Sequence, residues 1–122
     1  LAGTPFESTG HPILLPGNPR DGSSVMVAGE NASASAFSVN HGAGRRLSRT
    51  KAKKQLSQHE IDQGLAEHDV ISNCSVYPRD EAPDAYKDFE EVLKSVRQAG
   101  LATEVARLKA KFVIKDGAAA DD

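Results

Sequence analysis

Cysteine, tryptophan and long apolar runs are scarce in this chain, and each scarcity excludes a class of protein. Its 122 residues include one cysteine, no tryptophan and 5% aromatic residues. A single cysteine, Cys74, cannot form an internal disulfide or a multi-cysteine zinc site, which favours a reducing compartment. No apolar run reaches the length of a membrane span, and no signal-type segment is present. We therefore expect a cytoplasmic protein that has no membrane partner.

The composition that is present is ordinary for a globular protein, but its charge is unevenly placed. With 39% apolar and 26% charged residues, residues 1–122 fit a single region with a modest core. Residues 45–54 hold six cations and no acid, whereas residues 55–122 hold 14 acids and 8 bases. This basic block predicts a phosphate-bearing partner such as RNA, although a solvated lysine-rich helix is an equally common outcome. Its cations are Arg45, Arg46, Arg49, Lys51, Lys53 and Lys54.

The spacing of apolar residues predicts short strands packed with several helices, an α+β fold. Strands are predicted at 12–15, 24–28, 70–76 and 111–115, and residues 17–23 form the loop between the first two. Ser48 and Ser57 are typical N-caps for two successive helices, and residues 88–98 form the clearest helix, with Gly100 as its stop. Residues 31–39 receive no assignment. Residues 117–122 are expected to form a loose tail.

One imidazole, that of His41, lies between small residues and the basic block. Gly42, Ala43 and Gly44 allow the backbone to approach a ligand closely, and a helix beginning near Ser48 would direct its free N–H groups to the same place. Imidazole can act as a metal ligand, a general base or a covalent nucleophile. A lone histidine in a loop is more often structural or solvated, so the pattern alone leaves these alternatives open.

Two other segments have ordinary explanations as well as functional ones. The loop 17–22 has glycines at P-loop spacing, but Ser23 stands where the P-loop lysine belongs, so it is not a Walker A motif. Its backbone N–H groups and Ser23 can hold a phosphate or a base, yet a plain turn is favoured on spacing alone. The acidic turn at 80–88 places the hydroxyl of Tyr86 among carboxylates, and a capped entry to the next helix explains it equally well.

Three ordered segments resemble the RtcB-type RNA-splicing ligases. HGAGR at 41–45, followed by Ser48, Arg49 and AKK at 52–54, is similar to that family's signature. EAPDAYKD at 81–88 resembles a second signature, and segments 98–102, 105–108 and 113–115 resemble the end of the family's chain. The resemblance runs from Pro12 to Lys115 in the same order. It implies the C-terminal portion of a larger α+β ligase domain.

The resemblance implies a GTP- and manganese-dependent enzyme that joins an RNA 3′-phosphate or 2′,3′-cyclic phosphate end to a 5′-hydroxyl end. It makes His41 the residue that is guanylylated, from which GMP passes to the RNA 3′-phosphate. Tyr86 and Lys115 are implied at the guanine and Arg45 among phosphates. The implied nucleotide-contacting set is Pro16, Gly17, Asn18, Pro19, Ser23, His41, Gly42, Ala43, Gly44, Arg45, Tyr86 and Lys115, and the cations of residues 45–54 are the RNA-binding set.

The resemblance also implies that no metal ligand comes from this chain. The family's manganese ligands precede the matching region, so the missing N-terminal part is an expected partner and residues 1–122 alone are expected to be inactive. The chain departs from the family pattern at Asn18, Pro19, Arg20 and Asp116, and Arg20 adds bulk and charge where a nucleotide would approach. Two alternatives follow: a non-catalytic RNA-binding or regulatory paralogue that uses residues 45–54, and a small autonomous nucleic-acid-binding module.

Overall fold

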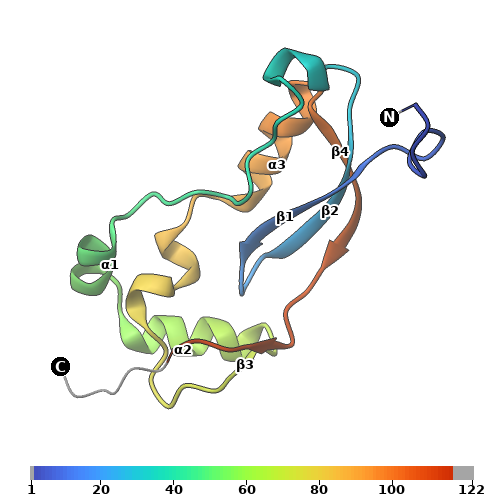
Figure 1. The fold of residues 1–122 in the computed structure, drawn as a ribbon. Helices are drawn as coiled ribbons and strands as arrows, with labels where there is room; N and C mark the ends of the chain where they lie inside the picture. Colours follow the sequence, from blue (N-terminus) through green and yellow to red (C-terminus); the bar gives the residue numbers. More distant parts are fainter. Residues whose placement is uncertain (1, 117–122) are drawn as a thin grey trace.

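The computed structural model describes residues 2–116, and its architecture is α+β (Figure 1), as the sequence predicts. The predicted tail at 117–122 lies outside the described residues. A sheet region is formed by β1 (Pro12–Asn18), β2 (Gly22–Ala28), α3 (Phe89–Gln98) and β4 (Ala102–Leu108). A helical region is formed by α1 (Arg49–Gln55), α2 (Gln58–Glu67), β3 (Ile71–Ser72), β5 (Phe112–Val113) and the 3₁₀ turns η2 (Arg79–Glu81) and η3 (Pro83–Ala85).

The sheet region is an antiparallel sheet in the order β1-β2-β4, with α3 packed against one face (Figure 1). Alternate strand residues point to this face because side chains in a strand alternate between its two sides. The helix contributes its apolar stripe, whose spacing the sequence predicted. The resulting cluster buries Leu15, Met26, Ala43, Phe89, Leu93, Val96 and Ala102.

The predicted boundary between β1 and its following loop is wrong. Residues 16–18 belong to β1, and β2 begins at Gly22, so Ser23 lies in a strand rather than in a loop. Pro16 is tolerated because β1 is an edge strand, which within residues 2–116 pairs with β2 alone, and because the register shifts between Pro16 and Asn18. Gly22 has φ = +86°, a conformation that favours glycine, and it closes the tight connection.

The three predicted helices are confirmed, and each begins at a side-chain cap. Oxygen atoms of Ser48, Ser57 and Asp88 accept hydrogen bonds from the backbone N–H three residues further on, at 3.2, 3.4 and 2.9 Å respectively. Gly100 has φ = +70° and ends α3 as predicted. The caps satisfy N–H groups that have no partner within the helix, so local sequence determines where each helix begins.

The other strand predictions need correction. The strand predicted at 70–76 is reduced to Ile71–Ser72, and the one predicted at 111–115 to Phe112–Val113. In the part of the chain that the structure describes, these two strands pair, in parallel, with each other alone. β4 was not predicted as a strand. Its apolar side chains at Val105 and Leu108 are exposed. The sequence of β4 therefore lacks the alternation of apolar and polar residues that marks a strand with one buried face. The unassigned segment contains a 3₁₀ turn, η1 (Ala32–Ser35).

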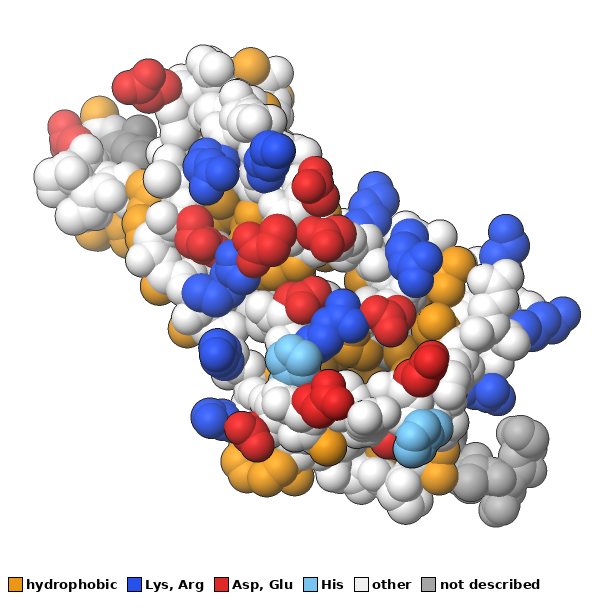
Figure 2. Space-filling view, turned by 180° about the vertical axis from the view of Figure 1, so that it is seen from behind, with side chains coloured by type: hydrophobic (Ala, Val, Ile, Leu, Met, Phe, Trp, Pro, Cys, Tyr) orange, Lys and Arg blue, Asp and Glu red, His pale blue; other side chains and the backbone are white. Residues whose placement is uncertain are grey.

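The helical region has a smaller apolar cluster, formed by Ile61, Leu65, Val70, Tyr77 and Ala82. Acidic and basic side chains lie interleaved over the face shown in Figure 2 rather than in one continuous basic patch. Between residues 2 and 116, none of the helices is long and apolar enough to cross a membrane.

Candidate functional site

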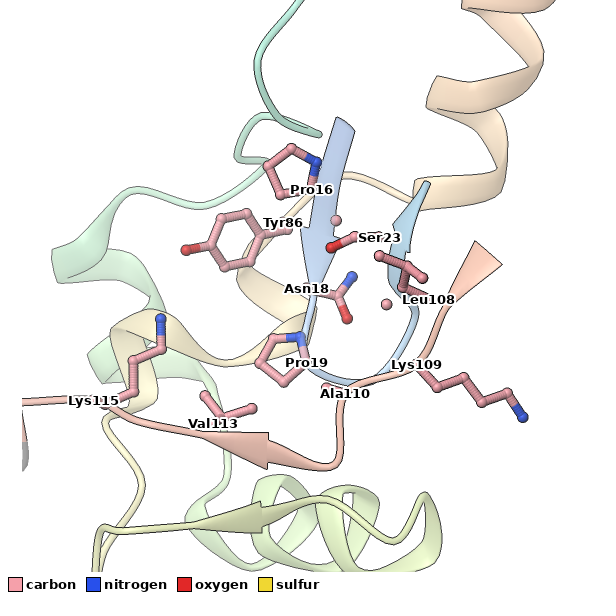
Figure 3. A pocket seen from close by; sticks show the side chains of 12 residues that line it. Pro16, Asn18, Pro19, Ser23, Tyr86, Leu108, Lys109, Ala110, Val113 and Lys115 are labelled. Atoms are coloured by element: carbon pink, nitrogen blue, oxygen red, sulfur yellow. The ribbon is translucent and has the colours of Figure 1, made fainter. Parts of the chain in front are cut away.

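A pocket of about 310 Å³ lies where the sheet region meets the helical region (Figure 3). The end of β1 and the start of β2 form one wall, and the segment that contains β5 forms another. Seven of the predicted nucleotide-contacting residues line this pocket, namely Pro16, Gly17, Asn18, Pro19, Ser23, Tyr86 and Lys115. Gly22, Leu108, Lys109, Ala110 and Val113 complete the lining. The structure therefore brings together residues that are far apart in the sequence.

The turn between β1 and β2 is held by the side chain of Asn18. Its Oδ1 accepts hydrogen bonds from the backbone N–H groups of Arg20 and Asp21, at 3.0 and 2.9 Å. Its Nδ2 donates to Asp21 Oδ2 at 2.8 Å. An asparagine side chain bonded to the backbone two and three residues on is a common way to fix a turn. This wall of the pocket is consequently ordered by its own local sequence.

Arg20 does not line the pocket, although its bulk was expected to intrude on a bound nucleotide. Its guanidinium contacts Asp21 Oδ1 at 3.2 Å and Asp84 Oδ1 at 2.8 Å. Partial burial opposes the charge, but the hydrogen bonds that the guanidinium donates to both carboxylates outweigh it, and the pKa of Arg20 is raised. The ion pair with Asp84 connects the β1–β2 turn to η3, which immediately precedes Tyr86.

Lys115 is held in place through both its backbone and its ammonium group. The backbone N–H of Lys115 donates to Asn73 Oδ1 and Asn73 Nδ2 donates to the Lys115 carbonyl, each at 2.9 Å. The Lys115 Nζ donates to Glu81 Oε2 at 3.3 Å, and the Tyr86 hydroxyl donates to the same oxygen at 2.9 Å. The Tyr86 hydroxyl and the Lys115 ammonium accordingly point toward one another at one end of the pocket (Figure 3).

Glu81 therefore organises this end of the pocket, and its role was not predicted. Arg49 also donates to its carboxylate and contacts Asp80 Oδ2 at 2.9 Å. Partial burial would raise the pKa of Glu81, but hydrogen bonds from Arg49, Tyr86 and Lys115 lower it overall. Burial and the hydrogen bond to Glu81 raise the pKa of Tyr86. The sequence shows only that an aromatic hydroxyl lies within an acidic turn. It does not show which carboxylate that hydroxyl contacts.

The loop that contains His41 is bonded to the same part of β1. The Ala43 N–H donates to the Pro16 carbonyl at 3.1 Å, and Asn40 Nδ2 donates to the Gly42 carbonyl at 2.9 Å. Gly44 has φ = +79°, which requires glycine-like freedom. The His41 side chain is exposed. His41 is thus on a loop whose backbone is fixed beside the pocket, although it is not among the residues that line it.

The predicted glycines of this loop line a second cavity, of about 500 Å³. Gly42, Ala43 and Gly44 form one side, and Lys87 with the first turns of α3 forms the other. The Lys87 N–H donates to the Gly44 carbonyl at 2.9 Å. The two groups of predicted nucleotide-contacting residues therefore line different cavities, connected by the bond between Ala43 and Pro16.

Arg45 packs against Tyr86. Its guanidinium carbon lies 5.0 Å from the centre of the Tyr86 ring, and the two residues form an isolated antiparallel bridge. Arg45 Nη2 donates to the Asp80 carbonyl at 2.6 Å and Nε donates to the Leu47 carbonyl at 3.1 Å. Within residues 2–116, the buried Nη1 has no hydrogen-bond partner. Arg45 supports the aromatic wall of the pocket, and the N–H groups of its buried Nη1 remain unpaired.

The six predicted RNA-binding cations do not behave alike. Arg45 and Arg49 are engaged with the acidic turn, as described above. Basic side chains project at the edge of the molecule where α1 lies (Figure 2). The exposed residues of the set are Arg46, Arg49, Lys51, Lys53 and Lys54. Arg45 and Arg49 thus hold the acidic turn, although Arg49 is also exposed, whereas Arg46 and the three lysines face solvent.

The part of the chain that the structure describes contains no group of three or more His, Cys, Asp or Glu side chains suited to a metal ion. Structural and catalytic metal sites in proteins usually take at least three protein ligands. These residues do not by themselves form a metal site.

Comparison with known proteins assigns the chain to a family. The sequence profile described as tRNA-splicing ligase RtcB matches residues 2–116. The chain belongs to the RtcB family. A tRNA-splicing ligase RtcB of Methanopyrus kandleri is 35% identical over 91% of the chain, and one of Nanoarchaeum equitans is 37% identical over 90%. An RNA-splicing ligase RtcB of Mycobacterium tuberculosis is 40% identical over 83% of the chain.

The chain spans only part of these family members. It covers 12% of the length of the Methanopyrus protein and 24% of the Nanoarchaeum and Mycobacterium proteins. Family membership therefore applies to a region that contains the His41 loop and the pocket, while most of each relative's length has no counterpart in these 122 residues.

Proposed function

We propose that this chain forms the nucleophilic and guanylate-binding part of a cytoplasmic RNA ligase, which joins a 3′-phosphate or 2′,3′-cyclic phosphate end to a 5′-hydroxyl end. The observation that supports this most strongly is the pocket between the two regions. The β1–β2 connection, Tyr86 and Lys115 line this pocket together. The His41 loop is hydrogen-bonded to Pro16, at the edge of the pocket. The names of the relatives support RNA as the substrate.

In the proposed reaction, an imidazole nitrogen of His41 attacks the α-phosphate of GTP. A phosphorus–nitrogen bond forms, the bond from that phosphorus to the bridging oxygen of the β-phosphate breaks, pyrophosphate leaves, and the imidazole proton passes to solvent. The RNA 3′-phosphate then displaces His41 from the GMP. Finally the 5′-hydroxyl oxygen attacks the RNA 3′-phosphate: a phosphodiester forms, the bond from that phosphorus to the GMP oxygen breaks, GMP leaves, and the hydroxyl proton passes to solvent. A 2′,3′-cyclic end must first be opened by water.

The side chains of this chain have distinct parts in the proposal. Tyr86 and Lys115 hold the base, and Gly42, Ala43 and Gly44 leave room for the backbone to approach phosphate. The buried Nη1 of Arg45 has no hydrogen-bond partner within residues 2–116, so its N–H groups are left for a phosphate oxygen that reaches it.

Manganese is implied by the family resemblance, but the residues described here do not fit a metal site, so no step is assigned to it. We place its ligands in the part of the family's chain that these residues do not span. Residues 1–122 alone should accordingly form no GMP adduct.

RNA is proposed to bind along the exposed face of α1. Lys51, Lys53 and Lys54 are exposed there and can contact backbone phosphates without reading sequence. Each phosphate neutralised releases counterions, so the affinity of the protein for RNA should fall steeply as salt concentration rises.

The decisive experiment replaces His41 by alanine in the full-length protein that carries this chain. Incubation with manganese and GTP labelled at the α-phosphate should label the unchanged protein covalently, and the His41→Ala variant should carry no label. His59, which is exposed on α2, provides the matched control, because His59→Ala should be labelled normally. A label that persists in the His41→Ala variant would remove His41 from the proposed role.

The alternative function, a non-catalytic RNA-binding paralogue, is favoured only by the exposed lysines of α1. It requires RNA binding but no nucleotide. Equilibrium dialysis of the full-length protein against labelled GTP separates the two: binding of GTP supports the ligase, while salt-sensitive RNA binding without GTP binding supports the paralogue.

A further inference from the structure

One oxygen atom, Oε2 of Glu81, contacts both polar groups at the end of the pocket. The hydroxyl of Tyr86 lies 2.9 Å from it and the Nζ of Lys115 lies 3.3 Å from it. Glu81 itself does not line the pocket, whereas the other two residues do. Glu81 can therefore influence a bound base only through the side chains of Tyr86 and Lys115.

The charge of Glu81 determines how these two groups can bond to anything else. An ionised carboxylate has no proton, so Tyr86 must donate its hydroxyl proton to Glu81. The Tyr86 oxygen is then left with lone pairs and can only accept a hydrogen bond from a ligand. The ammonium of Lys115 has three protons and can only donate. This end of the pocket consequently offers one donor and one acceptor in fixed positions.

The Watson–Crick edges of the two purines differ in the order of these groups. Guanine has an acceptor, O6, next to a donor, N1–H, whereas adenine has a donor, N6–H₂, next to an acceptor, N1. A Lys115 donor paired with a Tyr86 acceptor complements guanine. If its sugar and phosphates hold adenine in the same orientation as guanine, adenine brings a donor to the ammonium and an acceptor to the tyrosine oxygen. Both polar contacts are then unsatisfied, which is a costly arrangement in a partly enclosed site.

We propose that Glu81 is a positioning residue that sets the preference of this pocket for guanine over adenine. It accepts the Tyr86 hydroxyl proton, so that the Tyr86 oxygen can only accept from a bound base, and it holds the Lys115 ammonium where it can donate to that base. The inference rests on the proposed function, since it concerns the nucleotide of that reaction. Arg49 also contacts the Glu81 carboxylate and helps to keep it charged, which links α1 to the base end of the pocket.

Glu81→Gln tests this directly because the amide has nearly the same shape but can donate as well as accept. A glutamine that donates to Tyr86 lets the tyrosine turn its proton toward the ligand, which removes the discrimination. We expect the ratio of the dissociation constants for ADP and GDP, measured by isothermal titration on the full-length protein, to fall about tenfold or more. Glu67→Gln, an exposed carboxylate at the end of α2, removes the same charge and should leave the ratio unchanged.

A second variant separates positioning from a general loss of structure. Tyr86→Phe removes the acceptor oxygen, so Glu81→Gln should have little further effect on the ratio in a Tyr86→Phe background if Glu81 acts chiefly through Tyr86. A ratio that Glu81→Gln leaves unchanged, or a change of equal size in both backgrounds, would overturn the inference. The proposed function is assessed independently by labelling the unchanged protein at His41: if that label forms and the ratio does not respond to Glu81, only this inference fails.

Discussion

The sheet region and the helical region meet at one pocket but are stabilised by different kinds of interaction. In the sheet region, three antiparallel strands and α3 enclose one apolar cluster around Phe89 and Met26, which are 1% and 0% exposed. In the helical region the strands are two residues long and the apolar cluster is smaller. Its parts are joined instead by polar contacts of Asp80, Glu81 and Asn73.

This difference matches what each region contributes to the pocket. The sheet region supplies backbone: strand ends, a tight turn, and the Pro16 carbonyl that holds the His41 loop. The helical region supplies charged and hydroxyl groups, whose positions depend on pairing with each other. Apolar packing is non-directional and suits a frame, whereas hydrogen bonds between charged groups fix the direction of individual atoms.

The largest expected effect comes from Phe89→Ala in the sheet region. The Phe89 ring is closely packed: two of its atoms lie 2.9 Å from the position that a Cβ on Gly17 would take. The guanidinium carbon of Arg107 lies 5.2 Å from the ring centre. Removing the ring should lower the free energy of unfolding by about 3–5 kcal/mol, measured by urea denaturation. Leu65→Ala in the helical region should cost less. An equal or greater loss for Leu65→Ala would contradict the view that the sheet region provides most of the apolar stabilisation.

A smaller effect is expected at the start of α1 in the helical region. Ser48→Ala removes the oxygen that accepts from the Lys51 N–H, and should cost about 1 kcal/mol. Because α1 buries only Ala52, the loss should appear as faster hydrogen exchange within α1 rather than across the sheet. Thr50→Ala, two residues further along, serves as the control and should leave exchange nearly unchanged. Uniformly faster exchange in both regions would show that they unfold as one unit.

The features that the sequence predicted correctly are those that depend on interactions between residues close together in the chain. The caps at Ser48 and Ser57 and the stop at Gly100 depend on neighbours within one helical turn, and all three are confirmed. The end of β1 and all of β4 were missed, because their pairing depends on partners elsewhere in the chain rather than on their own alternation. Propensity and periodicity describe local preference, and tertiary pairing can override both.

The candidate site divides in the same way. Ordered motifs identified Tyr86, Lys115 and the β1–β2 connection, and the pocket contains them. Glu81 and Asn73 were not identified, because their contacts with Lys115 span 34 and 42 residues and arise only when the helical region folds. Arg20 was expected to obstruct the site. A sequence shows its charge but not that Asp84, 64 residues away, draws the guanidinium aside.

The smallest expected effect concerns that ion pair, the direct charged connection between the turn of the sheet region and η3. Arg20 and Asp84 are partly exposed, with side-chain exposures of 32% and 48%, so a double-mutant cycle of Arg20→Ala and Asp84→Ala should give a coupling energy of about 0.5 kcal/mol that decreases in high salt. Arg79→Ala, an exposed charge in η2, provides the control and should show no coupling to Asp84. If the pair also holds Tyr86 beside the turn, Arg20→Ala should weaken GDP binding by more than this coupling energy. Unchanged affinity would mean that the contacts of Tyr86 with Arg45 and Glu81 hold it in place without the ion pair.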